Sequence, residues 1–310
     1  MEKKIVFMGT PKFSVPILKS LHENGFSISA VYTQPPQKSQ RGQKINKSPV
    51  QQIAEALNIE CRTPNSLKDN QKELIYLKKL NPDIVIVVAY GQIIQKQFLE
   101  LKNTKFINIH ASILPKWRGA APIQRSIMNL DKETGISIMK IAEKLDSGPT
   151  CNIYKIKIDT KNNSEEISKK LSELASKKIV LEIKNILEGK AKFIEQNHNQ
   201  ATYAKKINKS EGLINWNESA EKIIGRINGL YPFPGAFFIY NNERYKILKG
   251  EIAKGKGKMG EVLENELVIA CGKDQSIKIL KIQREGKKPQ KIEDFILGSQ
   301  IKKGSNLNNA

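Results

Sequence analysis

The first 150 residues alternate between short apolar runs and segments with helical spacing, which limits the possible folds more than any other feature. The run from Asp83 to Tyr90, DIVIVVAY, is apolar throughout, as in a strand that is covered on both faces. Strands of this kind that alternate with helices predict parallel β-α units. We therefore expect an α/β fold with a mostly parallel sheet in the amino-terminal part of the chain.

The expected elements of this part follow one another in a regular order. The expected strands are 5–8, 28–33, 83–90, 106–110, 136–141 and 152–158. The expected helices are 15–22, 50–57, 67–80 and 164–187, the last one with apolar residues at helical spacing. A polar loop from Gln34 to Pro49 interrupts the series.

The remaining chain has a different character. Apolar periodicity fades between Gly189 and about Gly212, which predicts a linker. Beyond a helix at 220–229, short strands around 236–240, 244–252, 260–262, 267–270 and 277–284 predict a small β-barrel. The polar residues from about Ser299 onward are expected to be disordered. We therefore divide the chain into a domain of residues 1–188, a linker of 189–208 and a domain of 209–310.

The chain is strongly basic, with 52 Lys and Arg against 31 Asp and Glu and a net charge of +21. Such a charge attracts polyanions, above all nucleic acids. Lys supplies almost all of it, however, and Asn and Ile are also abundant, as a coding bias alone would produce. Only seven Arg occur, and Arg41 and Arg118 both lie in loops that contain Gly.

The sequence disfavours two classes of protein: membrane proteins and proteins that bind a metal ion through cysteines. No stretch approaches the roughly 18 to 20 apolar residues of a membrane span, and the amino terminus has no signal-peptide core, so we expect a cytoplasmic protein without a membrane segment. Cys61, Cys151 and Cys271 are far apart and lack the spacing of metal ligands. We expect inert thiols and no metal site.

The candidate chemistry lies where the strand at 106–110 ends. Asn108 and His110 are two residues apart, so their side chains share one face of that strand. In open α/β sheets ligands bind at the carboxyl ends of strands. An imidazole can move a proton near neutral pH, and a carboxamide can donate to an oxyanion. A structural role for the pair stays open at this point.

Asp146 is the third candidate. It lies in Leu145-Asp146-Ser147-Gly148-Pro149, where an Asp is most often a turn former. If the fold brings its carboxylate beside His110, it could hold the imidazolium or position a water. No Ser or Cys occupies a strained nucleophile elbow. The three side chains therefore favour direct transfer of an acyl-like group to an amine, without a covalent intermediate on the enzyme.

The stretch His110–Gln124, HASILPKWRGAAPIQ, resembles the signature of the methionyl-tRNA formyltransferase family. Other similar stretches cover essentially the whole chain: FMGTPKFSVPIL (7–18), YTQPPQKSQRGQKINKSPV (32–50), VVAYGQII (87–94), SGP (147–149) and ATYAKKI (201–207). Ala111 stands where Gly is frequent, and Ile113 replaces a usual leucine. Both departures are conservative.

The resemblance implies an architecture and a donor site. Asn108, His110 and Asp146 match the family's catalytic asparagine, histidine and aspartate. The family has a Rossmann-like amino-terminal domain that binds 10-formyltetrahydrofolate, a linker, and a carboxy-terminal OB-type barrel that helps to hold tRNA. By this resemblance four consecutive residues would line the folate site: Ser112, Ile113, Leu114 and Pro115.

The acceptor side also follows from the resemblance. The loop Gln34–Pro49, with Arg41, Lys44 and Lys47, corresponds to an insertion that enters the tRNA acceptor stem, and Lys206 is a further expected contact. The implied reaction moves the formyl group of 10-formyltetrahydrofolate to the amine of initiator methionyl-tRNA, by a monomeric enzyme without a metal. Three other functions stay open: formyl transfer to a sugar-nucleotide amine, hydrolysis of formyltetrahydrofolate, and RNA binding without catalysis.

Overall fold

A computed structural model describes residues 3–38 and 45–308. Contacts divide the chain into two units. The first consists of Met1–Ala120, Gly135–Ile156 and Ser168–Tyr203, and the second of Ala121–Thr134, Lys157–Ile167 and Ala204–Ala310. The second unit thus includes two segments that the predicted boundary at residue 188 assigns to the amino-terminal domain.

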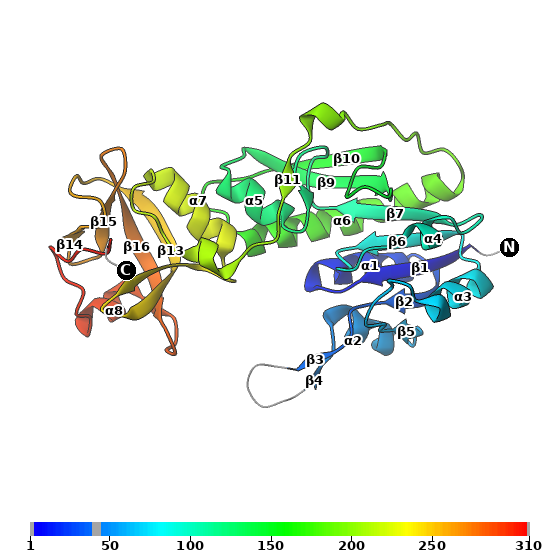
Figure 1. The fold of residues 1–310 in the computed structure, drawn as a ribbon, viewed down its shortest axis with the longest axis horizontal. Helices are drawn as coiled ribbons and strands as arrows, with labels where there is room; N and C mark the ends of the chain where they lie inside the picture. Colours follow the sequence, from blue (N-terminus) through cyan, green and yellow to red (C-terminus); the bar gives the residue numbers. More distant parts are fainter. Residues whose placement is uncertain (1–2, 39–44, 309–310) are drawn as a thin grey trace. The chain divides into compact units, whose positions relative to one another are not determined.

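The first unit contains a seven-stranded sheet in the order β10-β9-β7-β6-β1-β2-β5 (Figure 1). Its five strands from β7 to β5 are parallel, and β9 runs antiparallel to β7. This confirms the predicted mostly parallel sheet. The strands are β1 (Lys4–Gly9), β2 (Ser27–Tyr32), β5 (Cys61–Arg62), β6 (Ile84–Val88), β7 (Lys105–His110), β9 (Glu133–Lys140) and β10 (Thr150–Lys157). Short strands β3 (Gln37–Lys38) and β4 (Ile45–Asn46) pair with each other, and β8 (Arg118–Gly119) follows β7.

Helices connect and cover these strands. They are α1 (Val15–Glu23), α2 (Pro49–Ala56), α3 (Gln71–Leu80), α4 (Lys96–Leu99) and α6 (Ser164–Leu187), with short 3-10 turns at Lys12–Ser14 and His198–Gln200. Apolar residues of α3 and α4 pack with alternate residues of β1, β6 and β7, among them Val6, Val85 and Phe106. Because successive side chains of a strand point to opposite faces, Asn108 and His110 lie on the same face as Phe106.

Local signals explain where these helices begin and end. The Ser48 side chain accepts the Gln51 backbone N–H, and Pro49 occupies the first position of α2. Asn70 caps α3 in the same manner, so this helix begins at Gln71 and not at the predicted Leu67. The bounds of α6 coincide with the predicted helix 164–187.

The second unit is built on an antiparallel sheet in the order β12-β13-β16-β15-β14, with β17 beside β16. Its elements are α5 (Pro122–Met128), β11 (Tyr203–Ala204, which spans the division), a 3-10 turn at Lys209–Gly212, α7 (Ala220–Leu230), β12 (Ala236–Tyr240), β13 (Glu243–Ala253), β14 (Val262–Glu264), β15 (Val268–Cys271), β16 (Gln275–Arg284), β17 (Gln290–Lys291) and α8 (Ile292–Leu297). One core cluster joins α7 and α8 to the strands around Trp216 and Phe238. The antiparallel architecture agrees with the predicted OB-type domain.

The prediction of a disordered carboxyl terminus is wrong for residues 299–308. Ile301 and Leu307 are buried in the core of the second unit. Backbone hydrogen bonds from Gly304 to Val262, from Val262 to Ser305 and from Leu307 to Gly260 tie this segment to the start of β14 and to the residues just before it. The burial of these two apolar residues and the backbone pairing place this polar segment against the sheet.

Within the described residues, no helix has the length and apolar character that a membrane crossing requires.

Candidate active site

β7 brings the first two candidate residues to the carboxyl edge of the sheet. Asn108 lies between Val87 of β6 and Met139 of β9, and His110 ends the strand opposite Ser137. The expected common face is confirmed. His110 is only 6% exposed, because the loop that follows β7 folds back over its ring.

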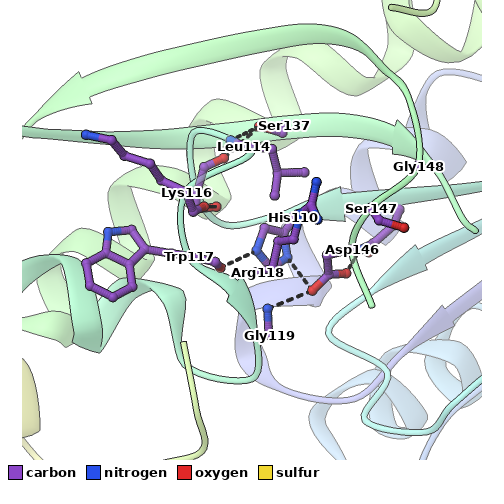
Figure 2. Close-up of polar contacts among 12 residues, drawn as sticks. His110, Leu114, Lys116, Trp117, Arg118, Gly119, Ser137, Asp146, Ser147 and Gly148 are labelled. Atoms are coloured by element: carbon purple, nitrogen blue, oxygen red, sulfur yellow. Dashed lines mark hydrogen bonds and ion pairs between the residues drawn. The ribbon is translucent and has the colours of Figure 1, made fainter. Parts of the chain in front are cut away.

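Asp146 reaches these residues from the turn between β9 and β10. Its backbone adopts a left-handed conformation with φ of 45°, which aims the carboxylate back at β7. Oδ1 accepts a hydrogen bond from Asn108 Nδ2 at 3.3 Å, and Oδ2 accepts one from the Gly119 N–H at 2.8 Å. Oδ2 also lies 3.6 Å from His110 Nδ1 (Figure 2). The structure therefore brings Asn108, His110 and Asp146 into one constellation.

The ring of His110 is held between two loops, as Figure 2 shows. Its Nε2 lies 2.9 Å from the Trp117 carbonyl oxygen. A carbonyl oxygen only accepts hydrogen bonds, so Nε2 carries a hydrogen and donates it. Nδ1, which faces Asp146, is then the nitrogen that can exchange a proton.

The loop after β7 is fixed by hydroxyl groups inside the unit. Ser112 Oγ donates to the Lys116 carbonyl at 2.6 Å, and Ser137 Oγ donates to the Ser112 carbonyl at 2.7 Å. The Leu114 N–H donates to Ser137 Oγ at 3.0 Å. Ser112 and Leu114 are buried, whereas Ile113 and Pro115 are partly exposed. Ser112 thus shapes the loop, and of the four predicted folate residues Ile113 and Pro115 offer the accessible surface. We call residues 108–119 and 146–149 together the catalytic edge.

Two residues that contact this region were not among the site residues predicted from the sequence. Arg118 and Gln196 are 4% and 8% exposed, and they hydrogen-bond to each other through Arg118 Nε and Nη2 at 3.1 and 2.6 Å. Arg118 stands out as one of few arginines, but no signal marks Gln196, which lies in a polar segment of Asn, Gln and Lys.

The residues predicted to contact tRNA are only partly described. Arg41 and Lys44 lie outside the described residues. Lys47 forms an ion pair with Glu55 at 2.7 Å, on the same unit as the catalytic edge. Lys206 is exposed on the second unit.

The structure offers no other centre for nucleophilic or metal chemistry in the residues it describes. Burial raises the pKa of Cys61, Cys151 and Cys271 to about 11, so these thiols stay protonated at neutral pH. No group of three or more His, Cys, Asp or Glu within residues 3–38 and 45–308 is placed to hold a metal ion. The catalytic edge combines a carboxamide donor with a proton-exchanging imidazole and a carboxylate, which suits stabilisation of a tetrahedral oxyanion.

Comparisons with known proteins give a consistent picture. Residues 3–183 match the family model described as formyl transferase, and residues 206–300 match that of the formyl transferase carboxy-terminal domain. A methionyl-tRNA formyltransferase of Pelagibacter ubique is 66% identical over 100% of both chains. That of Caldanaerobacter subterraneus is 39% identical over 98% of this chain and 99% of its own.

Solved structures resemble the fold at low identity. WlaRD, a sugar 3N-formyl transferase crystallised with dTDP and 5-N-formyl-THF, has a TM-score of 0.70 at 21% identity and covers 93% of this chain and 100% of its own. HypX from Aquifex aeolicus, in complex with tetrahydrofolic acid, has a TM-score of 0.66 at 16% identity and covers 96% of this chain and 47% of its own. At these identities the similarity concerns the fold alone.

Proposed function

Because the chain belongs to the methionyl-tRNA formyltransferase family, we propose that it transfers the formyl group of 10-formyltetrahydrofolate to the amino group of methionyl-initiator tRNA. The product is N-formylmethionyl-tRNA, which serves translation initiation. The observation that carries the proposal is the convergence of Asn108, His110 and Asp146 at the end of β7, in a chain that matches these enzymes over its full length.

In the proposed reaction, the amine attacks the formyl carbon and the carbonyl oxygen becomes an oxyanion. Asn108 Nδ2 carries two hydrogens, and one of them is directed to Asp146 Oδ1. The second can donate to the oxyanion. Asp146 orients this donor before the substrates arrive. A donor that is already oriented lowers the activation barrier for formyl transfer more than one that must first reorient.

A proton must leave the attacking amine and reach the departing folate nitrogen. The contact of His110 Nε2 with the Trp117 carbonyl directs this exchange to Nδ1. Asp146 Oδ2, 3.6 Å from Nδ1, stabilises the imidazolium while the proton is on the ring. The Gly119 N–H keeps that oxygen in place.

In the proposal the folate co-substrate binds beside the loop after β7. Ile113 and Pro115 are partly exposed there and can contact an apolar ring edge, while the buried Ser112 hydroxyl keeps the loop in shape. We assign Ser112, Ile113, Leu114 and Pro115 to this wall, with Ser112 and Leu114 acting through the loop conformation. No residue of the proposed mechanism requires a metal ion.

The tRNA side rests on charge. In the proposal Arg41, Lys44 and Lys47 of the loop 34–49 and Lys206 contact the acceptor arm. Lys47 would exchange its Glu55 partner for a phosphate. Arg41→Ala is expected to raise the KM for tRNA and to leave the KM for folate unchanged.

The second unit offers a further basic feature. Lys249 of β13, Lys281 of β16 and Lys291 of β17 lie directly opposite one another in the strand register, and all three are exposed. Among the described residues none of them has a carboxylate partner. Like charges directly opposite in a sheet are unfavourable, so a polyanion that neutralises them would bind strongly here. We call these three residues the lysine ladder and propose that it contacts the tRNA backbone.

A transfer assay separates the proposed function from its rivals. Purified protein is given formyl-folate with charged initiator tRNA, with a sugar-nucleotide amine, or with no acceptor. We expect formylation of the charged initiator tRNA and no reaction in the other two mixtures. Transfer to the aminosugar or release of formate without acceptor would replace the proposal by a sugar formyltransferase or a hydrolase, and RNA binding without any transfer would exclude an enzyme. We further propose that the protein acts as a monomer in the cytoplasm, which size-exclusion and fractionation would test.

A further inference from the structure

Gln196 uses its whole carboxamide to tie two loops of the catalytic edge together. Its Nε2 donates to the backbone carbonyl of Asp146 at 2.9 Å and to that of Gly148 at 2.7 Å. Its Oε1 accepts from Nε and Nη2 of Arg118. These are all four hydrogen bonds that a carboxamide can form.

The same contacts form a closed ring around the catalytic carboxylate. From Asp146 Oδ2 the ring passes through the Gly119 N–H to Arg118, then through its guanidinium to Gln196, and back to the Asp146 carbonyl. Arg118 also follows Trp117, whose carbonyl holds His110 Nε2. The conformation of residues 117–119 and that of residues 146–148 are therefore coupled through one side chain.

The segment that carries Gln196 is itself attached to the loop after β7. The Arg118 N–H donates to the Thr202 carbonyl at 2.8 Å, and the Trp117 N–H donates to Thr202 Oγ1 at 2.9 Å. His198 Nδ1 lies 2.9 Å from Arg118 Nη2. Residues 196–202, which the sequence predicted to be part of a linker, thus pack against the catalytic edge.

We propose that Gln196 is a positioning residue for formyl transfer: by holding the backbone of Asp146 and Gly148 against Arg118, it sets the carboxylate of Asp146 relative to His110 and Asn108. This inference rests on the proposed role of Asp146. Asp146 sits at a left-handed backbone position in a short turn, so its side-chain direction depends on external contacts. Gln196 is nine-tenths buried and makes two of them.

Gln196→Glu is the sharpest variant. A carboxylate still accepts from the Arg118 guanidinium, so the fold is kept, but it cannot donate to the two carbonyls. We expect kcat to fall about 10- to 100-fold, since small misplacements of catalytic groups have effects of that size. Neither KM should change by more than about threefold, and the thermal midpoint should fall less than in a variant that also loses the Arg118 contact. A normal kcat would overturn the proposal.

Gln196→Met supplies a second variant that keeps the volume and removes all four hydrogen bonds. It should lose both turnover and thermal stability, and if it does not fold, Gln196→Glu decides. Gln92→Met is the matched control, because Gln92 also joins two loops of the first unit, through the Leu67 N–H and the Pro64 carbonyl. It should lower the thermal midpoint and leave kcat unchanged; an equal loss of kcat would mean that any loosened loop slows the reaction, against the proposal.

A double-mutant cycle separates this inference from the function on which it rests. Asp146→Ala should lose about 10²-fold or more in kcat. If Gln196 acts through Asp146, adding Gln196→Glu to Asp146→Ala causes no further loss. Additive losses would overturn the role of Gln196 and leave that of Asp146 intact. A normal kcat of Asp146→Ala would instead remove the catalytic assignment itself.

Discussion

The catalytic edge and the lysine ladder arrange charge in opposite ways. Arg118 and His110 are buried and Asp146 is mostly covered, and each is held at a fixed place by hydrogen bonds to backbone or to Gln196. Lys249 and Lys281 are exposed and meet across two strands. Buried charges act through geometry, whereas exposed charges act through their number and are screened by salt. Single substitutions should therefore have large effects at the first site and graded effects at the second.

The largest effect is expected for Asn108→Ala. It removes the proposed oxyanion donor, and loss of one such donor typically lowers turnover by about 10²- to 10³-fold. The KM for folate should change little, because Asn108 acts at the reacting group in the proposed mechanism and the loop after β7 stays fixed by Ser137. Steady-state kinetics on charged tRNA gives both constants. Near-normal turnover would show that the catalytic edge does not work through this donor.

A somewhat smaller loss is expected for Gly148→Ala. A Cβ at this position would lie 2.0 Å from the Lys140 carbonyl oxygen, so the turn of residues 146–149 must move. Displacement of Asp146 should lower kcat by about 10- to 100-fold. The control is Gly298→Ala on the second unit, where a Cβ meets nothing within 4 Å. If both variants kept full turnover, the geometry of the turn would not limit the reaction.

The sequence predicted the catalytic edge as far as local periodicity reaches. The common face of Asn108 and His110 follows from the two-residue repeat of a strand, and Asp146 lies in a recognisable turn. Gln196 contacts Asp146 over 50 positions and Arg118 over 78, and polar contacts at such separations have no periodic signal. The lysine ladder depends on irregular register between Ile247 and Gly250, which cannot be read from alternation. Burial of Ile301 and Leu307 likewise depends on pairing with a distant strand.

Lys281→Ala tests the expectation that single substitutions in the lysine ladder have modest effects. Removing one phosphate contact should raise the KM for tRNA several-fold and reduce the salt dependence of binding by about one unit of slope. Stability should not fall, because the substitution also relieves repulsion with Lys249 and Lys291. Lys278→Ala on the same strand is the control, since Lys278 is paired with Glu266 at 2.5 Å. Equal effects of both variants on the KM for tRNA would mean that the net charge of the protein promotes tRNA binding and that the lysine ladder makes no specific contact.

The smallest effect is expected for Glu211→Gln. Its carboxylate lies between the two extremes of the comparison, because it is neither buried nor fully exposed. Glu211 accepts from Arg125 Nη1 and Nη2 at 2.5 and 3.0 Å and from the Asn208 N–H at 2.8 Å, and the pair is only partly exposed. The Arg125 guanidinium holds the pKa of Glu211 below its ordinary value. The stabilisation is therefore complete above the ordinary carboxyl pKa of about 4.3 and is lost as the pH falls through the lowered value.

Urea unfolding should accordingly show Glu211→Gln to be about 1 kcal/mol less stable than the parent at pH 7, with the difference shrinking in acid below about pH 4. Turnover should be unchanged, because Glu211 orders its own unit and lies outside the catalytic edge. Glu188→Gln is the control, since its ion pair with Lys190 is exposed. Equal losses in the two variants would mean that the partly covered Arg125–Glu211 pair stabilises the protein no more than the exposed Glu188–Lys190 pair. Large effects of single charged residues would then be confined to the catalytic edge.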